Sequence, residues 1–359
     1  MSRDPVVIVG AGLSGLYLAR LLEQKGSPVS VLEARDRVGG RIVSEKIDAA
    51  PQASVDLGPA WVWPQLQPRL SRLLEELGIE VFAQYVDGDS LLQGPDGRVQ
   101  RHPGPSPHSE SYRIVGGAQA LVDALAGGLG ASIHLNTEVR SIDANTRTVT
   151  ARSGGELVEF PAGRVVSAMP LRLLADSVQL IPDVDEAIRR QWRAVPTWMA
   201  GHCKILLLYE APLWREQGLS GEAFSQRGPL TEVYDGSPYS ASDTAGCYAL
   251  TSFVGLSALQ RWQAGEGPLV EASLAQLEQL FGSGARDVKQ VIVKDWSGEV
   301  HTTTEADLAG PHEHPHYPPT APRQVLDGYL LLAGTEAARE YGGIVEGALE
   351  SAEEIVGLL

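Results

Sequence analysis

The chain has few cysteines, no long apolar run and fewer basic than acidic residues. Cys203 and Cys247 are its only cysteines, so a disulfide framework is not indicated and a reducing cytoplasm is the expected location. No apolar run approaches the roughly 20 residues of a membrane span, and the N-terminus has no secretory h-region. With 29 basic and 45 acidic residues, the net charge of −16 argues against nucleic acid or anionic membranes as partners.

The remaining composition is typical of a globular protein. The chain is 43% hydrophobic and 21% charged, and its 359 residues predict about two domains. It has no internal repeat and no low-complexity tract. An acidic chain attracts cationic substrates, although solubility is the commoner reason for such a charge.

The N-terminal stretch predicts a strand, a glycine turn, a helix and a second strand. Val6–Val9 is a short β-branched apolar run, which suits a strand buried on both faces. The apolar spacing over Leu13–Gln24 predicts a helix packed against a sheet, and Val29–Leu32 predicts the second strand. The helix N-terminus directs amide N–H groups and a partial positive charge at a phosphate.

The turn between the first strand and the helix follows the pattern G-x-G-x-x-G. Gly10 permits the tight turn, Gly12 lets the backbone approach a pyrophosphate, and Gly15 lets the helix pack close to the sheet. Glu33 follows Gly10 by 23 residues, where an acid accepts hydrogen bonds from the ribose of an adenine dinucleotide. These residues predict NAD(P) or FAD as the ligand without deciding between them.

The segment that follows favours FAD over NAD(P) as the ligand. Residues 33–41, EARDRVGGR, resemble the E-x-x-x-R-x-G-G-R signature of the flavin-containing amine oxidases, which include monoamine, polyamine and L-amino-acid oxidases. Gly39 and Gly40 offer a second backbone approach to a diphosphate, and Arg41 offers a bidentate cation, with a surface salt bridge as the alternative. The resemblance implies FAD, with further contacts from Leu13, Ser14, Ala34 and Arg35.

The C-terminal region resembles the same family. Its G-T-E element is Gly334, Thr335 and Glu336, whose acid the resemblance assigns to flavin hydroxyls. A final helix up to Leu358 is then expected, with its N-terminus facing the pyrimidine edge of the flavin. There the helix dipole stabilises negative charge on the reduced ring. Its first contacts are expected from Gly343, Ile344 and Val345.

Between the two ends, the resemblance covers shorter segments. The residues expected to pass the flavin ring are Gly58, Pro59, Ala60 and Trp61, with an ordinary loop before the helix 67–77 as the alternative. The resemblance also implies a backbone contact from Val139 to adenine. Ala168, at the end of the strand expected from Val165, closes the first cofactor region.

Three residues are expected to act beside the flavin, namely Lys204, Trp296 and Tyr341. Lys204 lies in the apolar strand 201–209, where a lysine is costly unless it has a partner or a function. The resemblance implies that Lys204 holds a water near flavin N5; the alternative is the exposed face of an edge strand. Trp296 matches the tryptophan beside the flavin, with a core aromatic as the alternative.

The histidines of residues 301–323 invite a metal interpretation that we do not favour. His312, His314 and His316 alternate, but four prolines keep this stretch extended, with no regular element to set ligand geometry. We expect a loop over the substrate funnel and no metal site.

The sequence also departs from the family. The loop 297–304 has no Phe, Tyr or Trp, and Ile344 stands at the second aromatic position, so the usual aromatic cage is expected to be absent or rebuilt from Tyr341, Trp61 or Tyr317. The cysteine that binds flavin covalently in monoamine oxidases is missing, which predicts non-covalent FAD. The chain is also shorter than typical family members. We therefore expect a short, soluble member of the bacterial type, without a membrane anchor.

We therefore expect an α/β fold in which a Rossmann-like FAD domain of the p-hydroxybenzoate-hydroxylase (GR2) type is interleaved with a mixed α+β substrate domain. The expected FAD-binding segments are 1–80, 112–170 and 290–359, and the substrate domain is expected from 81–111 and 171–289.

The expected reaction oxidises the C–N bond of an amine or amino acid to an imine by hydride transfer to flavin N5. Dioxygen, giving hydrogen peroxide, or another acceptor reoxidises the flavin. The alternatives are a related flavoenzyme acting on C–C bonds, a desaturase or isomerase, and an FAD-binding protein without turnover. The sequence leaves the particular amine and the oligomeric state open.

Overall fold

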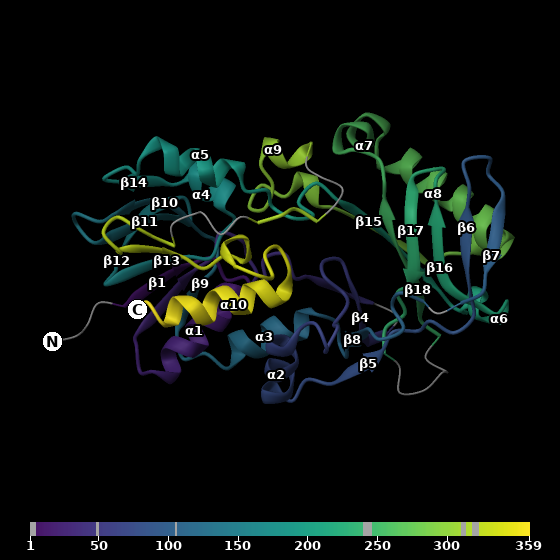
Figure 1. Ribbon diagram of the computed structural model, residues 1–359, viewed down its shortest axis with the longest axis horizontal. Coiled ribbons are helices and arrows are strands. Elements are labelled where there is room, and N and C mark those ends of the chain that lie inside the picture. Colours follow the sequence, from purple (N-terminus) through teal and green to yellow (C-terminus); the bar gives the residue numbers. More distant parts are fainter. Residues whose placement is uncertain (1–4, 48–49, 105, 240–245, 310–313, 318–322) are drawn as a thin grey trace.

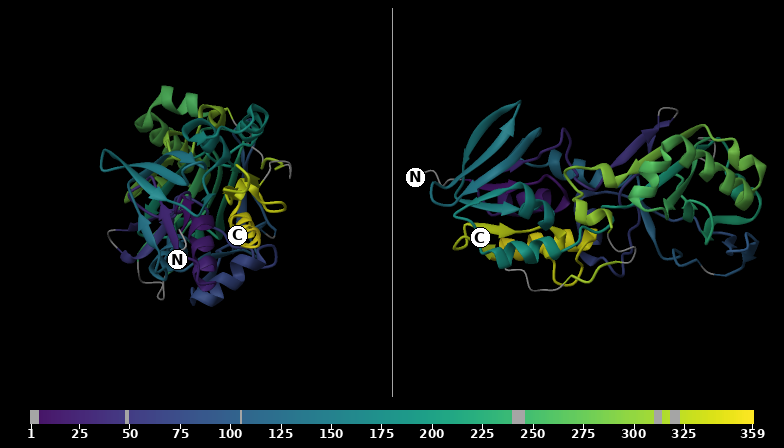
Figure 2. Two further views of the ribbon diagram at one scale, coloured as in Figure 1. Left: turned by 90° about the vertical axis from the view of Figure 1, so that its left-hand side faces the viewer. Right: turned by 90° about the horizontal axis from the view of Figure 1, so that it is seen from above.

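Two large β-sheets organise the chain, one towards each end of an elongated molecule (Figure 1). The computed structural model describes residues 5–47, 50–104, 106–239, 246–309, 314–317 and 323–359. Figure 2 shows the same separation from above. The cavity described below lies between the two sheets.

The first sheet has six strands. Its order is β20 (Gln324–Val325), β21 (Leu330–Leu332), β13 (Arg164–Ser167), β1 (Val6–Val9), β2 (Val29–Leu32) and β9 (Ser132–His134). All neighbours pair in parallel except β20 and β21. The parallel strands therefore follow the 3-2-1-4-5 order of the dinucleotide-binding Rossmann fold, which confirms the expected FAD-domain architecture.

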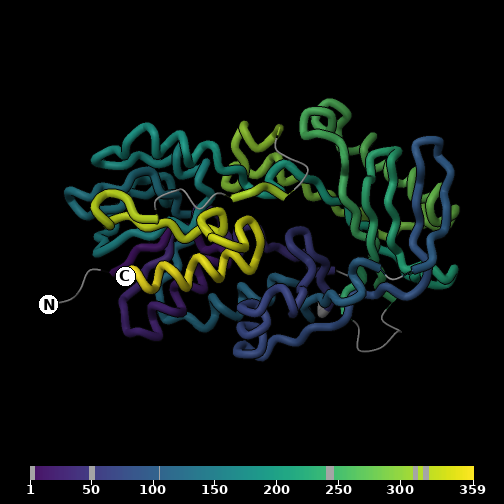
Figure 3. The backbone as a smooth tube through the Cα atoms, viewed as in Figure 1, coloured from purple at the N-terminus to yellow at the C-terminus, as the bar shows by residue number. Residues whose placement is uncertain are grey.

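Helices cover one face of this sheet and a smaller sheet covers the other. The helices are α1 (Leu13–Gln24), α2 (Pro68–Leu77), α3 (Gln119–Gly127) and α10 (Val345–Val356), which share one apolar core with β1 and β2. Figure 3 shows the first and last helices side by side although they lie at opposite ends of the chain. The smaller sheet has the order β12 (Glu156–Pro161), β11 (Thr148–Ser153), β10 (Thr137–Asp143) and β14 (Gln179–Ile181).

The second large sheet has seven strands. Its order is β19 (Gln290–Asp295), β15 (Cys203–Tyr209), β18 (Tyr248–Val254), β17 (Leu230–Asp235), β16 (Leu219–Ser225), β6 (Asp89–Gln93) and β7 (Val99–His102). The helix α8 (Glu266–Phe281) shares an apolar core with this sheet, and the hairpin β3 (Ser44–Ile47) and β4 (Ala50–Asp56) packs on β15 in a second core. This hairpin joins the N-terminal part of the chain to the second sheet.

The remaining elements are short. They are the strands β5 (Val81–Ala83) and β8 (Tyr112–Ile114), which pair with each other, and the helices α4 (Leu171–Ser177), α5 (Glu186–Ala194), α6 (Leu213–Glu216), α7 (Ala258–Ala264) and α9 (Glu305–Leu308). Arg113 lies in β8, and left-handed turns at Gly116 and Gly117 (φ 82° and 84°) precede α3.

The sheets differ from the expected domain limits at two places. The strand β19 begins at residue 290, in the segment assigned to the FAD domain, yet it pairs with β15 in the seven-stranded sheet. Residues 171–194, assigned to the substrate domain, pack against the six-stranded sheet through Leu174 and Trp192. Strand pairing across the chain, which local composition does not encode, sets both limits. Among the described helices, none combines the length and the apolar character needed to cross a membrane.

The packing of α1 on β1 depends on a glycine. A Cβ atom on Gly15 would lie 2.0 Å from the carbonyl oxygen of Gly10 and 3.3 Å from the side chain of Ile8. We expect Gly15→Ala to lower the free energy of unfolding by about 3 kcal/mol, the upper end of ordinary overpacking costs, because backbone must shift. Thermal and urea unfolding measure the change.

The matched control is Gly127→Ala in α3, where the added Cβ would meet nothing within 4 Å. Its stability should be unchanged or raised by up to about 1 kcal/mol. Equal stabilities of the two variants would contradict the close packing.

Candidate active site

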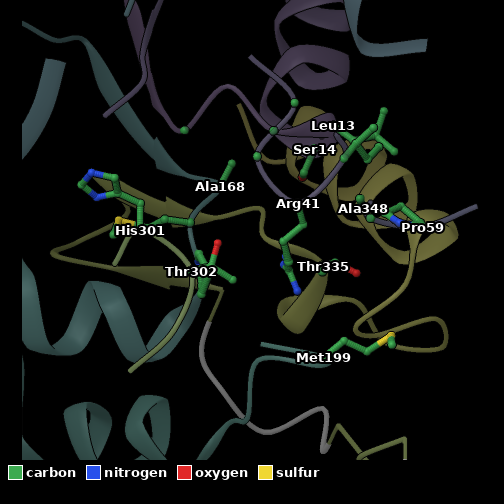
Figure 4. Close-up of a pocket in the computed structure, with 18 of the residues that line it drawn as sticks. Leu13, Ser14, Arg41, Pro59, Ala168, Met199, His301, Thr302, Thr335 and Ala348 are labelled. Atoms are coloured by element: carbon green, nitrogen blue, oxygen red, sulfur yellow. The ribbon is translucent and has the colours of Figure 1, made fainter. Parts of the chain in front are cut away.

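A cavity of about 480 Å³ lies between the two large sheets. Its wall comes from the β1–α1 turn, the segments 39–42 and 57–63, the strands β15 and β18, and the start of α10. Figure 4 shows Arg41 extending into it between Thr302 and Thr335. The cavity therefore joins the glycine-rich turn to the second sheet.

Most of the predicted site residues line this cavity. They are Gly10, Gly12, Leu13, Ser14, Glu33, Ala34, Arg35, Gly39, Gly40, Arg41, Gly58, Pro59, Ala60, Trp61, Val139, Ala168, Lys204, Trp296, Thr335, Gly343, Ile344 and Val345. Four predicted residues do not line it, namely Gly15, Gly334, Glu336 and Tyr341.

The two glycine motifs form one backbone surface. Gly12 and Gly39 form a parallel bridge, and the amide of Gly39 donates to the carbonyl of Ala11 at 2.8 Å. A Cβ on Gly12 would lie 3.9 Å from the carbonyl oxygen of Gly39 and 4.0 Å from the Cα of Gly40, so the two motifs are in van der Waals contact. Together with the N-terminus of α1, this surface fits the diphosphate of a dinucleotide.

Glu33 is held in place by backbone amides. Its Oε2 accepts from the amide of Ala11 at 2.8 Å and its Oε1 from the amide of Arg35 at 2.9 Å. The carboxylate is buried but lines the cavity, and each of its oxygens has a second lone pair. It fits the ribose of an adenine dinucleotide, in the position that the motif predicts.

Arg41 and Glu336 act as a pair. The guanidinium of Arg41 lies 2.7 Å from Oε1 of Glu336, whose side chain is buried behind it. Within the described part of the chain, no hydrogen bond reaches Oε2 of Glu336. Glu336 therefore stands behind the cavity wall, where it orients Arg41.

The N-terminus of α10 is positioned by buried acids. Glu350 accepts hydrogen bonds from the amides of Arg339, Glu340 and Tyr341, and Glu346 accepts from the first amides of α2. The hydroxyl of Thr335 donates to the carbonyl of Ile344 at 2.7 Å. These contacts hold the positive end of the helix at the cavity.

Lys204 and Trp296 converge on one turn of backbone. The ammonium of Lys204 donates to the carbonyl of Gly58, and Nε1 of Trp296 donates to the carbonyl of Leu57 at 3.0 Å. The edge-strand alternative for Lys204 is wrong, because β15 lies between β18 and β19 and Lys204 is only 4% exposed. Burial lowers the pKa of Lys204 to about 8.

Of the three aromatic residues expected to rebuild the cage, only Trp61 lines the cavity. Tyr341 lies outside its wall, and Tyr317 packs against the backbone of Gly342 and Gly343. The sequence reasoning missed Phe253 and Trp63, which do line it. Phe253 lies in the mainly apolar strand β18, so its sequence context is that of a core residue.

Glu299 is a second residue that the sequence reasoning missed. It accepts a hydrogen bond from Nη2 of Arg35 at 3.2 Å and another from Lys294, whose ammonium lies 4.7 Å above the ring of Trp296. Burial raises the pKa of Glu299, but the hydrogen bond and charge of Lys294, with those of Arg35, lower it overall. The same guanidinium donates to Thr302 at 2.7 Å, so it fastens the loop 299–302 to the turn after Glu33.

The histidines of the 301–323 stretch do not form a metal centre in the described residues. His312 lies outside them, and His314 is hydrogen-bonded at 3.0 Å to the carbonyl of Gly342. In the parts of the chain that the structure describes, no three His, Cys, Asp or Glu side chains are grouped to hold an ion. This stretch contains the short helix α9, which was not expected.

The Rossmann sheet, the paired glycine motifs and the cavity define a dinucleotide-binding oxidoreductase. Family comparison matches residues 101–356 to the flavin containing amine oxidoreductases and residues 8–77 to an NAD(P)-binding Rossmann-like domain. Since the first match covers more than half of the chain, the protein belongs to the flavin-containing amine oxidoreductase family. It is an FAD-dependent amine oxidoreductase, as the sequence predicted.

Individual relatives agree with this assignment. A probable flavin-containing monoamine oxidase A of Dictyostelium discoideum is 25% identical, with 96% of this chain and 95% of the relative covered. A putrescine oxidase of Kocuria rosea is 41% identical over 37% of this chain and 27% of its own length. A solved putrescine oxidase bound to putrescine shares the fold, with a TM-score of 0.80, 23% identity and 99% of each chain covered.

The Glu299 contacts generate a prediction about cofactor retention. Glu299→Gln removes the charge that fastens Arg35 to the loop 299–302, so the wall of the cavity should open more readily. We expect the FAD dissociation rate to rise about tenfold, as for the loss of one charge-assisted hydrogen bond. Fluorescence of released FAD measures it.

Glu305→Gln is the matched control, because Glu305 is an exposed acid in the adjoining helix α9. Its dissociation rate should equal that of the wild type. A Glu299→Gln rate indistinguishable from both would show that the fastening does not retain FAD.

The burial of Lys204 generates a second prediction. Its folded pKa of about 8 lies below the ordinary value of 10.5, so the folded protein releases this proton first. The stability of the wild type relative to Lys204→Met should therefore rise between about pH 8 and 10.5 and stay level below pH 8. Urea unfolding of both proteins across this range measures the difference, and a pH-independent difference would contradict the lowered pKa.

Proposed function

We propose that the protein oxidises the C–N bond of an amine to an imine, with the substrate bound between Lys204, Trp296 and the start of α10. The observation that supports this most directly is the convergence of Lys204 and Trp296 on the carbonyls of Gly58 and Leu57. The convergence lies on the same cavity wall as the glycine motifs. In this proposal, FAD supplies the two-electron acceptor.

The chain's own residues would hold the cofactor and the reacting amine. Gly12, Gly39 and Arg41 would bind the diphosphate, and Glu33 the ribose. The positive end of α10 would stabilise the negative charge that develops on reduction. Lys204 would hold a water at the reacting end of the cavity, because its ammonium has donors beyond the one given to Gly58.

The cavity would also select the protonation state of the substrate. A free alkylamine has a pKa near 10.4, so roughly one molecule in a thousand is neutral at pH 7.4. The buried ammonium of Lys204 repels a second ammonium, and desolvation raises the neutral fraction further. The neutral form is the one that can give up hydride from its α-carbon.

Several finer points belong to the same proposal. The seven-stranded sheet would be the substrate domain, dioxygen the reoxidant that yields hydrogen peroxide, and the cytoplasm the location.

FAD would be bound without a covalent bond, because neither cysteine lines the cavity. Acid precipitation should leave the yellow colour in the supernatant; colour in the protein pellet would contradict non-covalent binding.

A panel of amines tests the proposed reaction. Anaerobic mixing of the holoenzyme with each amine should bleach the flavin for at least one of them, and air should then restore the colour with release of hydrogen peroxide. Bleaching without peroxide would indicate a different electron acceptor. The absence of bleaching by every amine would refute amine oxidation and favour C–C chemistry or a protein without turnover.

For a substrate found in this way, Lys204→Met should keep the fold and the bound FAD, since an uncharged side chain of similar length replaces a costly buried amine. Flavin reduction, reoxidation or both should slow at least about tenfold, because the positioned amine acts on groups that change charge. Stopped-flow spectroscopy measures both rates. Two rates equal to those of the wild type would assign Lys204 to structure alone.

A further inference from the structure

We infer that the substrate is a monoamine with an apolar carbon skeleton, held against an aromatic wall formed by Trp61, Trp63 and Phe253, and that diamines, polyamines and amino acids are excluded. This inference rests on the proposed function. It concerns the part of the cavity wall beside Lys204.

The aromatic wall lies directly beside Lys204. The ammonium is 5.0 Å from the ring centre of Phe253 and 5.8 Å from that of Trp61. The rings of Trp61 and Phe253 are 6.3 Å apart, and Trp63 lies 6.3 Å from Trp61. All three rings line the cavity, so an apolar group that enters it meets aromatic surface.

The orientation of Trp61 is fixed from behind. Its Nε1 donates to the side-chain oxygen of Gln84 at 2.9 Å, and Gln84 in turn donates to the carbonyl of Asp235 at 2.7 Å. The rings of His108 and Tyr234 pack against it, with centres 4.7 and 5.1 Å away. A ring held on several sides presents a preorganised surface, which lowers the entropic cost of binding.

The charges on the cavity wall do not suit a second ammonium. Among the described residues that line the cavity, Glu33 and Glu138 are the carboxylates. They lie together at the dinucleotide end, where the amide of Thr137 donates to the carbonyl of Glu33, and Glu138 is paired with Arg140 at 2.7 Å. The described wall formed by β15, β18 and the segment 57–63 contributes a cation, Lys204, and no carboxylate.

The acids behind the aromatic wall and Lys204 do not line the cavity; Asp56, whose charge raises the pKa of Lys204, is already paired with Arg113 at 3.4 Å. Glu222 is buried and accepts a hydrogen bond from Ser106, and Glu232 accepts from the hydroxyl of Tyr234 at 2.6 Å. Tyr234 packs on the far side of Trp61, so these carboxylates are separated from the cavity by rings. A distal ammonium would lose its water without gaining a counter-ion.

A substrate carboxylate would likewise lack a free partner of opposite charge on the described wall. The cations of the described wall are already engaged: Arg35 with Glu299, Arg41 with Glu336, and Lys204 with the carbonyl of Gly58. An amino acid would have to displace one of these partners. The overall fold is shared with a putrescine oxidase solved with putrescine, a diamine, so the fold likeness alone would favour the opposite specificity.

Matched pairs of ligands test the inference. Hexylamine and 1,6-diaminohexane differ by one ammonium, and 2-phenylethylamine and phenylalanine differ by one carboxylate. With the holoenzyme, kcat/KM should be at least about a hundredfold higher for the first member of each pair, because the second member buries an unpaired charge. Equal or reversed values for either pair would overturn the inference.

Binding to the oxidised enzyme separates this inference from the proposed reaction. Hexylamine and 1,6-diaminohexane are titrated against the flavin absorbance without turnover. If no amine is oxidised but hexylamine still binds at least about tenfold more tightly, the proposed function fails and the specificity of the site stands. If the diamine binds as well or better, the inference fails whatever the reaction.

A pair of variants tests the aromatic wall itself. Phe253→Leu removes a ring from the wall, and Phe224→Leu removes one that packs on Tyr234 outside the cavity. We expect Phe253→Leu to keep FAD and to raise the dissociation constant of 2-phenylethylamine about tenfold, while Phe224→Leu leaves it unchanged. The same dissociation constant in wild type and Phe253→Leu would contradict the assignment of the wall.

Discussion

The site depends on a short piece of backbone at Leu57 and Gly58, whose two carbonyls accept hydrogen bonds from Trp296 and Lys204. Lys204 is buried in a central strand, where an ammonium is stable only with an acceptor. Only glycine fits at position 58, because a Cβ there would lie 2.2 Å from the carbonyl oxygen of Arg41. One contact therefore joins the seven-stranded sheet, the loop after β4 and the arginine of the dinucleotide site.

Acidic side chains fix most of the surrounding geometry from behind the cavity wall. Glu336 holds Arg41, Glu350 holds the turn before α10, and Glu346 joins α10 to α2. Each is buried and accepts hydrogen bonds or an ion pair, so its charge is compensated within the protein. Many acids of this strongly acidic chain are therefore structural, and they leave the cavity itself with an excess of cations.

The sequence identified the parts of the site that depend on the backbone. Gly10, Gly12 and Gly15 could be assigned because a turn, a close approach and a close packing each tolerate only glycine, and Lys204 because an ionisable residue in an apolar strand is costly. Glu299 and Phe253 could not. The role of Glu299 depends on its contact with Arg35, 264 residues away in the sequence. Phe253 has the same local sequence pattern as a core residue. The sheet to which β19 belongs could not be predicted for the same reason, since β19 and β15 are paired across some 80 residues of intervening chain.

The interleaving of the two sheets has a consequence for biosynthesis. The strand β1 and the glycine turn are made first, but the neighbouring strand β13, the strand β21 beyond it and the facing segment 335–345 follow only much later. At roughly 5–20 residues per second, tens of seconds pass between the two ends of the same cavity. Until β13 is made, one edge of β1 lacks its partner, and the buried acids of α10 do not exist until the end of synthesis. The complete FAD site can therefore be filled only after residue 345 has been made.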